Sequence, residues 1–336
     1  VDKKAPYKAV CTHGWVVDGE GKKMSKSLGN GVAPSEIIDQ YGAEILRLWV
    51  SSSDYHADIR ISKDILKQLS EGYRKLRNTA RFMLGCLSDF DSEKDQTDEL
   101  TELDRWALAR FNSLIEKAKA AYDAFDYHIV YHALLTFCTI DMSNFYLDIL
   151  KDRLYVEKKD GPSRRAAQTV VYKILSGFTR LIAPILTFTA QEIWDFLPGK
   201  KQVFVVLEDM PAPERVDFSD ADREKFEAII SVREDVKKSL EQARNDKVIG
   251  SSLDAAVTLC AEGALLSVLK ANIASLAEIF IVSEVTLSDK KEGESFNIRD
   301  LYIKTEKSSK QKCERCWKYT EIGVDGVCDR CRTVLA

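Results

Sequence analysis

Apolar residues recur along much of this 336-residue chain at intervals of three, four or seven, which is the period of an amphipathic helix. In the segment 62–87 the repeating positions are Ile65, Leu69, Leu76, Ala80, Met83 and Leu87. The same period predicts three further long helices, over about 102–126, 129–154 and 163–197. Pro184 is expected to kink the last of them. Because the connections are short, we expect these helices to form an antiparallel bundle over residues 61–200.

The pattern changes on both sides of this bundle. The first 17 residues carry short β-favouring runs that predict a strand, a turn and a strand, and Pro34 and Gly42 mark two short helices after them. Beyond the bundle, a linker over 200–218 and a charged helix over about 219–246 are followed by alternating strand and helix signals. These signals are a strand at Leu253–Cys260, a helix at 264–276 and strands at 279–287 and 301–305. The chain is therefore predicted to be mainly α, with a small α+β module within residues 201–306.

The charge and hydropathy of the chain narrow the possible partners. A net charge of -4 argues against coating of nucleic acid by the whole surface, so polyanions would have to bind local patches. The most apolar segment, 174–194, is interrupted by polar residues and is too short to span a membrane, and no secretory signal opens the chain. We expect a cytoplasmic protein without a membrane partner. The chain begins at Val1 rather than at a methionine, which suggests a piece of a longer protein.

One predicted helix carries such a local patch. Segment 62–87 has six Lys and Arg residues against Asp64 and Glu71. At about 100° per residue, five of the basic residues fall within roughly 40° of one line along the helix. We call them the basic stripe: Lys63, Lys67, Arg74, Arg77 and Arg81. Contact with an RNA backbone and simple solvation of this face are equally compatible with the pattern.

The eight cysteines fall into two groups. Four are isolated in apolar or helical contexts and are expected to be buried in a reducing compartment: Cys11, Cys86, Cys138 and Cys260. The other four form two Cys-x-x-Cys pairs separated by eleven residues, Cys313 and Cys316 followed by Cys328 and Cys331. This spacing predicts one structural zinc ion in a zinc ribbon over residues 307–336, which is too short to fold around a core of its own.

Aromatic residues directly follow the first cysteine pair. Trp317 and Tyr319 lie among seven Lys and Arg residues and four acidic residues, a local excess of positive charge. Exposed aromatic rings among basic residues are typical stacking surfaces for RNA bases. Trp317 could equally cover the metal site, and the sequence leaves both interpretations open.

A basic loop near the start of the chain has the composition of a phosphate-binding site. Three lysines and two serines lie within residues 22–27, and glycines stand on both sides at 19, 21, 29 and 31. Ammonium and hydroxyl groups can follow a charge that moves during phosphoryl chemistry, and the glycines would allow the loop to open and close. We call residues 19–31 the lysine loop.

The string Lys23-Met24-Ser25-Lys26-Ser27, continued by Leu28-Gly29-Asn30, matches the signature loop of class I aminoacyl-tRNA synthetases. Further segments point to one branch of that class: residues 12–19, 45–50 and 73–82, and the terminal Cys-x-x-Cys-Trp. With these segments the chain resembles bacterial-type isoleucyl-tRNA synthetases, from the end of the catalytic domain to the C-terminus. Valyl and leucyl relatives share the loop type but lack a terminal ribbon of this kind.

The resemblance implies four parts: the end of a class I catalytic domain (1–60), an anticodon-binding bundle (61–200), a linker with a small α+β module (201–306) and an RNA-contacting zinc ribbon (307–336). It implies ATP-dependent activation of isoleucine and its transfer to tRNA(Ile), with Mg²⁺ accompanying ATP. Lys26 and Lys23 would stabilise the triphosphate, Met24 and Ser25 would lie near the adenine, and Ser27, Gly29 and Asn30 would shape the loop. The basic stripe and Trp317 would contact the tRNA.

The resemblance also implies that part of the enzyme is absent. The family's His-x-Gly-His motif, amino-acid pocket and editing insertion lie upstream, and no such motif occurs in this sequence. We therefore expect a monomer that needs upstream catalytic and editing domains of the same protein and that is inactive alone. The alternatives are a valine- or leucine-specific relative, a non-catalytic RNA-binding module in which the loop is a vestige, and a zinc-ribbon protein that binds DNA.

Overall fold

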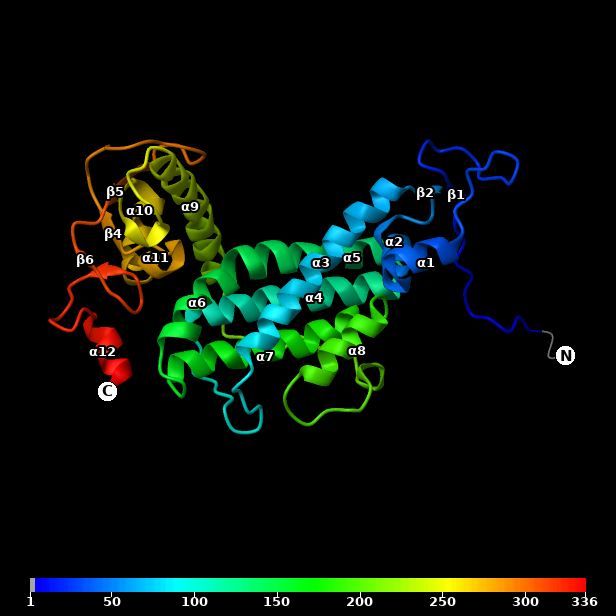
Figure 1. The fold of residues 1–336 in the computed structure, drawn as a ribbon, viewed down its shortest axis with the longest axis horizontal. Helices are drawn as coiled ribbons and strands as arrows, with labels where there is room; N and C mark the ends of the chain where they lie inside the picture. The colour runs from blue at the N-terminus through cyan, green and yellow to red at the C-terminus, as the bar shows by residue number, and fades with distance from the viewer. Residues whose placement is uncertain (1–3) are drawn as a thin grey trace. The chain divides into compact units, whose positions relative to one another are not determined.

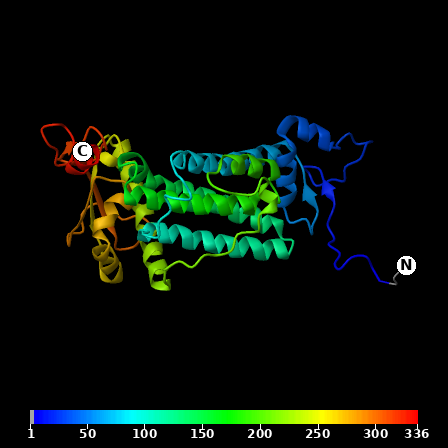
Figure 2. The same ribbon diagram turned by 90° about the horizontal axis from the view of Figure 1, so that it is seen from below.

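A computed structural model describes residues 4–336, and the fold is mainly helical, as predicted (Figures 1 and 2). Contacts divide the chain into two compact units. Unit 1 holds the residues up to Asp95 together with Leu108–Asn144 and Thr169–Arg215. Unit 2 holds Gln96–Ala107, Phe145–Gln168 and Val216–Ala336. The four-part division expected from the sequence remains a prediction.

Unit 1 begins with a small parallel pair of strands and two helices. Strand β1 (Val16–Val17) pairs with β2 (Ile59–Arg60), and helices α1 (Pro34–Tyr41) and α2 (Ala43–Ser52) lie between them in the chain. Gly42 separates the two helices at a φ of 87°, which glycine adopts readily. The expectation of two strands before the lysine loop was wrong for the described residues 4–17, where β1 alone is a strand.

The helix predicted over 62–87 is confirmed as α3 (Lys63–Cys86). The hydroxyl of Ser62 caps it by accepting a hydrogen bond from the backbone N–H of Ile65. One face of α3 is buried, with Leu66, Leu76 and Met83 almost inaccessible to solvent. Within unit 1, α3 contacts α2, α5 (Tyr127–Thr136) and α8 (Thr187–Phe196) (Figure 1).

At Pro184 the long helix predicted over 163–197 is interrupted rather than kinked. It consists of α7 (Pro162–Ile182) and α8, with a short break between them. Arg47 of α2 donates to the carbonyl oxygens at this break, from Nη2 to Pro184 at 2.6 Å and from Nε to Ile185 at 2.9 Å. Glu44 of α2 accepts from the backbone N–H groups of Phe188 and Thr189, at 2.8 and 3.0 Å. Helix α2 therefore supplies partners for both ends of the break.

A second long helix runs from Tyr127 to Val156. It consists of α5, a π-helical stretch (Phe137–Tyr146) and α6 (Leu147–Val156). This helix is long and apolar enough to cross a membrane, which corrects the expectation that no segment is. However, 61% of its most apolar stretch is buried inside the protein, and Met142, Tyr146 and Leu150 are fully covered. Its hydropathy is that of a core helix.

Unit 2 contains the α+β module. Helix α9 (Asp220–Asn245) starts at a capping box formed by Ser219 and Asp222. It contacts strand β5 of a three-stranded sheet whose order is β4 (Glu284–Leu287), β3 (Ala255–Cys260) and β5 (Tyr302–Lys307). Strand β4 pairs with β3 in parallel and β5 pairs with β3 antiparallel.

Two elements of this module differ from the prediction by more than two residues. The helix expected over 264–276 is two helices, α10 (Gly263–Ala271) and α11 (Ile273–Phe280), bent by 87° at the break between them. The strand expected from residue 279 begins only at Glu284, because the helix continues to Phe280 and Ile281 ends it at a φ of 58°. The chain ends with short strands β6 (Gln311–Lys312) and β7 (Tyr319–Thr320) and helix α12 (Asp329–Leu335).

A buried ion pair lies within unit 2. Arg153 on α6 donates to both carboxylate oxygens of Asp104, which lies on helix α4 (Glu102–Asp123), at 2.8 and 2.9 Å. The Tyr146 hydroxyl donates to the same carboxylate at 2.7 Å, and Arg153 Nη2 also donates to the backbone carbonyl of Ser163 at 2.6 Å. The carboxylate is fully buried and the arginine nearly so, which makes each charge dependent on the other.

We expect Asp104→Ala to lower the free energy of unfolding by about 3–5 kcal/mol, because Arg153 would remain buried without a counter-charge. Asp160 offers a matched control, since it pairs with Arg165 from a side chain that is 81% exposed, and Asp160→Ala should cost less than about 1 kcal/mol. Urea unfolding followed by circular dichroism measures both values. Equal losses in the two variants would contradict the importance of the buried pair.

Candidate functional site

The carboxylate of Asp18 organises the base of the lysine loop. It accepts hydrogen bonds from the Asn30 side chain at 2.8 Å and from the backbone N–H groups of Lys22 and Glu20, at 2.8 and 3.0 Å. The bond from Asn30, followed by the backbone donors, holds the pKa of Asp18 below its ordinary value. Asp18 immediately follows β1, so the short sheet fixes the point at which the loop begins.

Asn30 joins the two sides of the loop. Its side-chain oxygen accepts from the backbone N–H of Ser25 at 2.9 Å, and its amide nitrogen also donates to the carbonyl of Lys23 at 3.3 Å. The Ser25 hydroxyl lies 3.1 Å from that of Ser27 and accepts from the backbone N–H of Leu28. Gly29 closes the turn at a φ of 62°. The loop is therefore tied at its base by Asp18 and Asn30.

The three lysines of the loop differ in their partners. Lys22 pairs with Glu20 at 2.7 Å. Lys23 and Lys26 are exposed, and neither forms an ion pair with any residue in the described range 4–336. Met24 and Ser25 are half-buried, whereas Ser27 and Gly29 are exposed. The two unpaired ammonium groups are those available to an anionic ligand.

All five residues of the basic stripe are exposed on one face of α3. Arg77 forms an ion pair with Glu192 of α8, at 2.8 Å. The other four have no ion pair with the residues that the structure describes. The acidic neighbour of Arg77 could not be inferred from the periodicity of α3, because it belongs to a helix more than one hundred residues away in the sequence.

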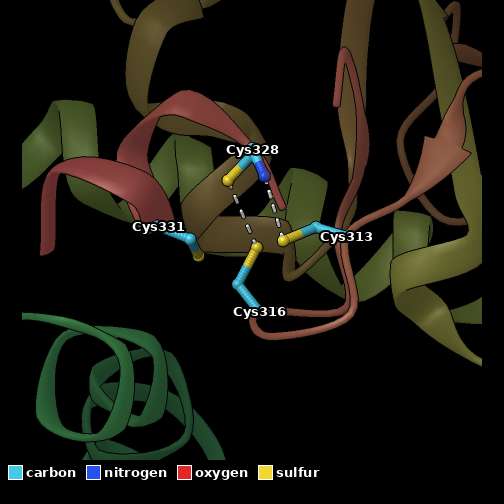
Figure 3. Close-up of side chains that lie close together, drawn as sticks. All are labelled: Cys313, Cys316, Cys328 and Cys331. Atoms are coloured by element: carbon cyan, nitrogen blue, oxygen red, sulfur yellow. Dashed lines mark hydrogen bonds between the residues drawn. The ribbon is translucent and has the colours of Figure 1, made fainter. Parts of the chain in front are cut away.

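The four paired cysteines come together at one point (Figure 3). Their sulfur atoms all lie within 4.8 Å of one another, and the side chains of Cys313 and Cys331 are fully buried. The Sγ atoms of Cys316 and Cys328 are 3.8 Å apart. Four thiolates in a tetrahedron with metal–sulfur bonds of about 2.3 Å would be separated by roughly the same distance. The cluster therefore fits a closed four-thiolate metal site.

Local hydrogen bonds favour a thiolate at one member of this cluster, Cys313. Burial opposes ionisation of Cys313, but backbone N–H groups of Cys316, Cys328 and Arg315 outweigh it and lower its thiol pKa to about 6. The Cys328 donor is 3.3 Å from the sulfur. Burial raises the pKa of the neighbouring Cys316 thiol to about 12.

The isolated cysteines lie elsewhere. Cys86, Cys138 and Cys260 are buried, as expected. The expectation was wrong for Cys11, which is exposed, with its sulfur 3.1 Å from the Tyr55 hydroxyl. Cys11 lies in a stretch without regular structure.

Trp317 does not cover the cysteine cluster. The partly buried apolar side chains packed against the four sulfurs are Val156, Ile322 and Val327. The Trp317 side chain is 61% exposed, at a positive φ of 65°, and the Lys312 ammonium lies 5.9 Å from its ring centroid. Its contact with RNA remains a prediction.

Two family models match the chain. Residues 104–259 match the anticodon-binding domain of tRNA ligase, and residues 1–62 match tRNA synthetases class I (I, L, M and V). The chain is 53% identical over 98% of its length to an isoleucine–tRNA ligase of Syntrophotalea carbinolica and 50% identical over 98% to one of Geobacter sulfurreducens. It is 48% identical over its full length to that of Bacillus mycoides. The chain belongs to the class I tRNA synthetase family.

This synthetase chain spans 37–38% of the length of those relatives. The matched anticodon-binding region includes most of the predicted bundle and begins within α4. The matched class I region includes the whole lysine loop and ends at the N-cap of α3. The family resemblance drawn from the loop and the cysteine pairs is thus confirmed.

Asp152 connects the cysteine module, residues 307–336 of the synthetase chain, to helix α6. Arg330 donates to both of its carboxylate oxygens, at 2.5 and 2.8 Å, and Lys318 Nζ lies 3.3 Å away. Burial would raise the pKa of Asp152, but Arg330 and Lys318 outweigh it and hold the pKa low. Lys318 follows the first cysteine pair and Arg330 lies between the cysteines of the second, so both halves of the module meet one carboxylate.

Three residues of these sites were missed from the sequence: Asp18, Glu192 and Asp152. Asp18 was detectable in principle, since an acidic residue between a strand and a glycine-rich turn commonly caps local N–H groups. Glu192 and Asp152 are ordinary acidic residues on helices, and only the packing of distant segments gives them their partners.

We expect Asp152→Asn to release the cysteine module from α6, because an amide cannot replace a carboxylate that binds two cations. Hydrogen bonds to charged groups typically contribute about 2 kcal/mol. Losing this much of the free energy that holds residues 307–336 against α6 would raise their protease-accessible fraction roughly thirtyfold. Limited proteolysis with mass spectrometry measures this. Glu157→Gln is the matched control, since Glu157 lies 3.6 Å from Arg330 and should matter little. Equal cleavage of both variants would exclude Asp152 as the anchor.

Proposed function

We propose that this chain is part of an isoleucine–tRNA ligase, which activates isoleucine with ATP and transfers it to tRNA(Ile). The observation that carries the proposal is the 47–53% identity to isoleucine–tRNA ligases over 98–100% of the chain. These relatives give no support to a valine- or leucine-specific enzyme. Because the chain spans little more than a third of their length, the amino-acid pocket and the editing domain would be supplied by other residues of the same protein. We place the enzyme in the cytoplasm as a monomer.

In this proposal the lysine loop serves the activation step. Attack of the isoleucine carboxylate on the α-phosphate of ATP transfers negative charge to the departing pyrophosphate. The exposed ammonium groups of Lys23 and Lys26 would stabilise that charge, and Mg²⁺ bound to ATP would share it. Met24 and Ser25 would lie beside the adenine, and Ser27, Gly29 and Asn30 would set the shape of the loop. The Asp18–Asn30 pair would keep the loop base fixed while its tip moves.

Lys26→Ala in the complete ligase should reduce isoleucine-dependent ATP–pyrophosphate exchange by about 100-fold, the usual cost of removing one group that stabilises transition-state charge. Lys22→Ala is the control, because Lys22 is already paired with Glu20 and should leave the exchange rate within about twofold. Steady-state kinetics of the two variants test the assignment. Exchange by Lys26→Ala at the rate of Lys22→Ala would show that the loop is not catalytic.

We further infer that the four cysteines hold one structural zinc ion. Four thiolates with matching sulfur separations and no open ligand position are typical of such a site, and the short module around them has little other core. Bound zinc would fix the positions of Lys318 and Arg330 opposite Asp152. The metal would then be a folding element rather than a participant in the reaction.

The purified protein should contain one zinc ion per chain, and Cys316→Ser should lose it because a closed site needs all four thiolates. Zinc content by mass spectrometry and protection of residues 307–336 from hydrogen exchange measure binding and folding separately. Cys11→Ser serves as the control, since Cys11 is exposed and lies outside the cluster. A Cys316→Ser variant that retains zinc and protection would rule out the proposed site.

The helical part would bind the tRNA. Residues 104–259 match an anticodon-binding domain model, which supports binding of the anticodon arm by this region. The basic stripe on α3 lies outside the matched residues, and its exposed cations support contact with RNA phosphates. Lys63, Lys67, Arg74 and Arg81 have no acidic partner among the described residues and are therefore the stripe residues most available to RNA. Trp317, exposed beside Lys312, would stack on a tRNA base.

A further inference from the structure

A surface pocket lies where the basic stripe meets helix α8. It has a volume of about 230 Å³ and is lined by Arg77, Arg81 and Leu84 of α3 and by Glu192, Ile193 and Phe196 of α8. All six belong to unit 1. Ligand pockets for drug-sized molecules are usually about 300–1,000 Å³, so this one suits a single flat ring better than a larger molecule.

The walls of this pocket, which we call the α3–α8 pocket, differ in chemistry. Phe196 is 72% exposed, so its ring is accessible to a ligand. Arg81 is exposed and has no ion pair within residues 4–336. An uncovered aromatic face beside a free guanidinium group is the combination that binds a base and its phosphate in single-stranded nucleic acid.

Glu192 adds a selective group. One of its oxygens accepts from Arg77 at 2.8 Å, and its side chain remains 53% exposed, so the carboxylate can accept further hydrogen bonds. A carboxylate accepts only and repels phosphate, which favours a base that offers two adjacent N–H donors. Among the common bases, guanine presents such a pair on its Watson–Crick edge, whereas uracil presents one donor between two acceptors.

We propose that the α3–α8 pocket binds one unpaired RNA nucleotide, with its base stacked on Phe196 and hydrogen-bonded to Glu192, and its phosphate held by Arg81. The preferred base is guanine. This site rests on the RNA-binding role proposed for the basic stripe and extends it from backbone contact to recognition of one base. Neither Phe196 nor Glu192 carries a positive charge, so a stripe that only attracts phosphates would not need them.

The test is equilibrium binding of the 336-residue chain, measured by fluorescence anisotropy at fixed salt. The probes are labelled single-stranded RNA heptamers that differ only in a central guanine or uracil. Phe196→Ala should weaken binding of the guanine heptamer at least about fivefold, the lower limit for loss of one base–aromatic stack. Glu192→Gln should abolish a guanine preference of about tenfold without weakening the uracil heptamer.

The chain offers matched controls for both parts of the site. Phe188 lies on the same helix, is 71% exposed and does not line the pocket, so Phe188→Ala should bind both heptamers normally. Arg74 belongs to the stripe but lies outside the pocket, so Arg74→Gln should weaken both heptamers equally. Unchanged thermal unfolding of each variant verifies that it is folded.

The outcomes separate the pocket from the stripe. If Phe196→Ala binds like Phe188→Ala while Arg74→Gln and Arg81→Gln bind weakly, the pocket is not a base site and the proposed RNA-binding stripe stands. If neither arginine variant loses affinity, the stripe proposal also fails. Weakening by Phe196→Ala with no difference between the two heptamers would overturn the role of Glu192 and the preference for guanine.

Discussion

The helix break at Pro184 is the constraint on which unit 1 depends. Interrupting a helix leaves carbonyl oxygens on one side and N–H groups on the other without partners, and burying them unpaired would cost several kcal/mol. Arg47 and Glu44, one helical turn apart on α2, satisfy both sides. Helix α2 thereby joins the segment of the lysine loop to α8, the helix that carries Phe196. Both segments belong to unit 1.

Charge pairing separates the residues available to ligands from those that support the structure. Lys22, Arg153 and Arg330 each have a carboxylate partner, whereas Lys23, Lys26 and most of the basic stripe have none within the described residues. Paired cations are neutralised locally and hold segments together. Unpaired, exposed cations retain their attraction for phosphates. An overall acidic chain can in this way present two separate surfaces of unpaired cations.

The sequence predicted the helices of the fold and the cysteine cluster, because both signals are local. The period of apolar residues placed α3 to within one residue, and the charged helix expected over 219–246 agrees with α9 to within one residue. The cysteine spacing identified the four sulfurs that converge. It failed where a boundary depends on distant packing, as at Ile281, where a β-branched residue with positive φ ends α11 before β4 begins. The partners of Glu192 and Asp152 lie more than one hundred residues away, beyond the reach of any local pattern.

The two cations on Asp152 come from opposite halves of the cysteine module, and this has an evolutionary consequence. The carboxylate at position 152 stabilises the structure only while the two cysteine pairs keep Lys318 and Arg330 within hydrogen-bonding distance of it. A lineage that lost the four cysteines would leave this carboxylate partly buried without a counter-charge, and selection would then favour an apolar or amide side chain there. We therefore expect positions 152, 318 and 330 to co-vary with the four cysteines during evolution, although position 152 is distant from the others in the sequence.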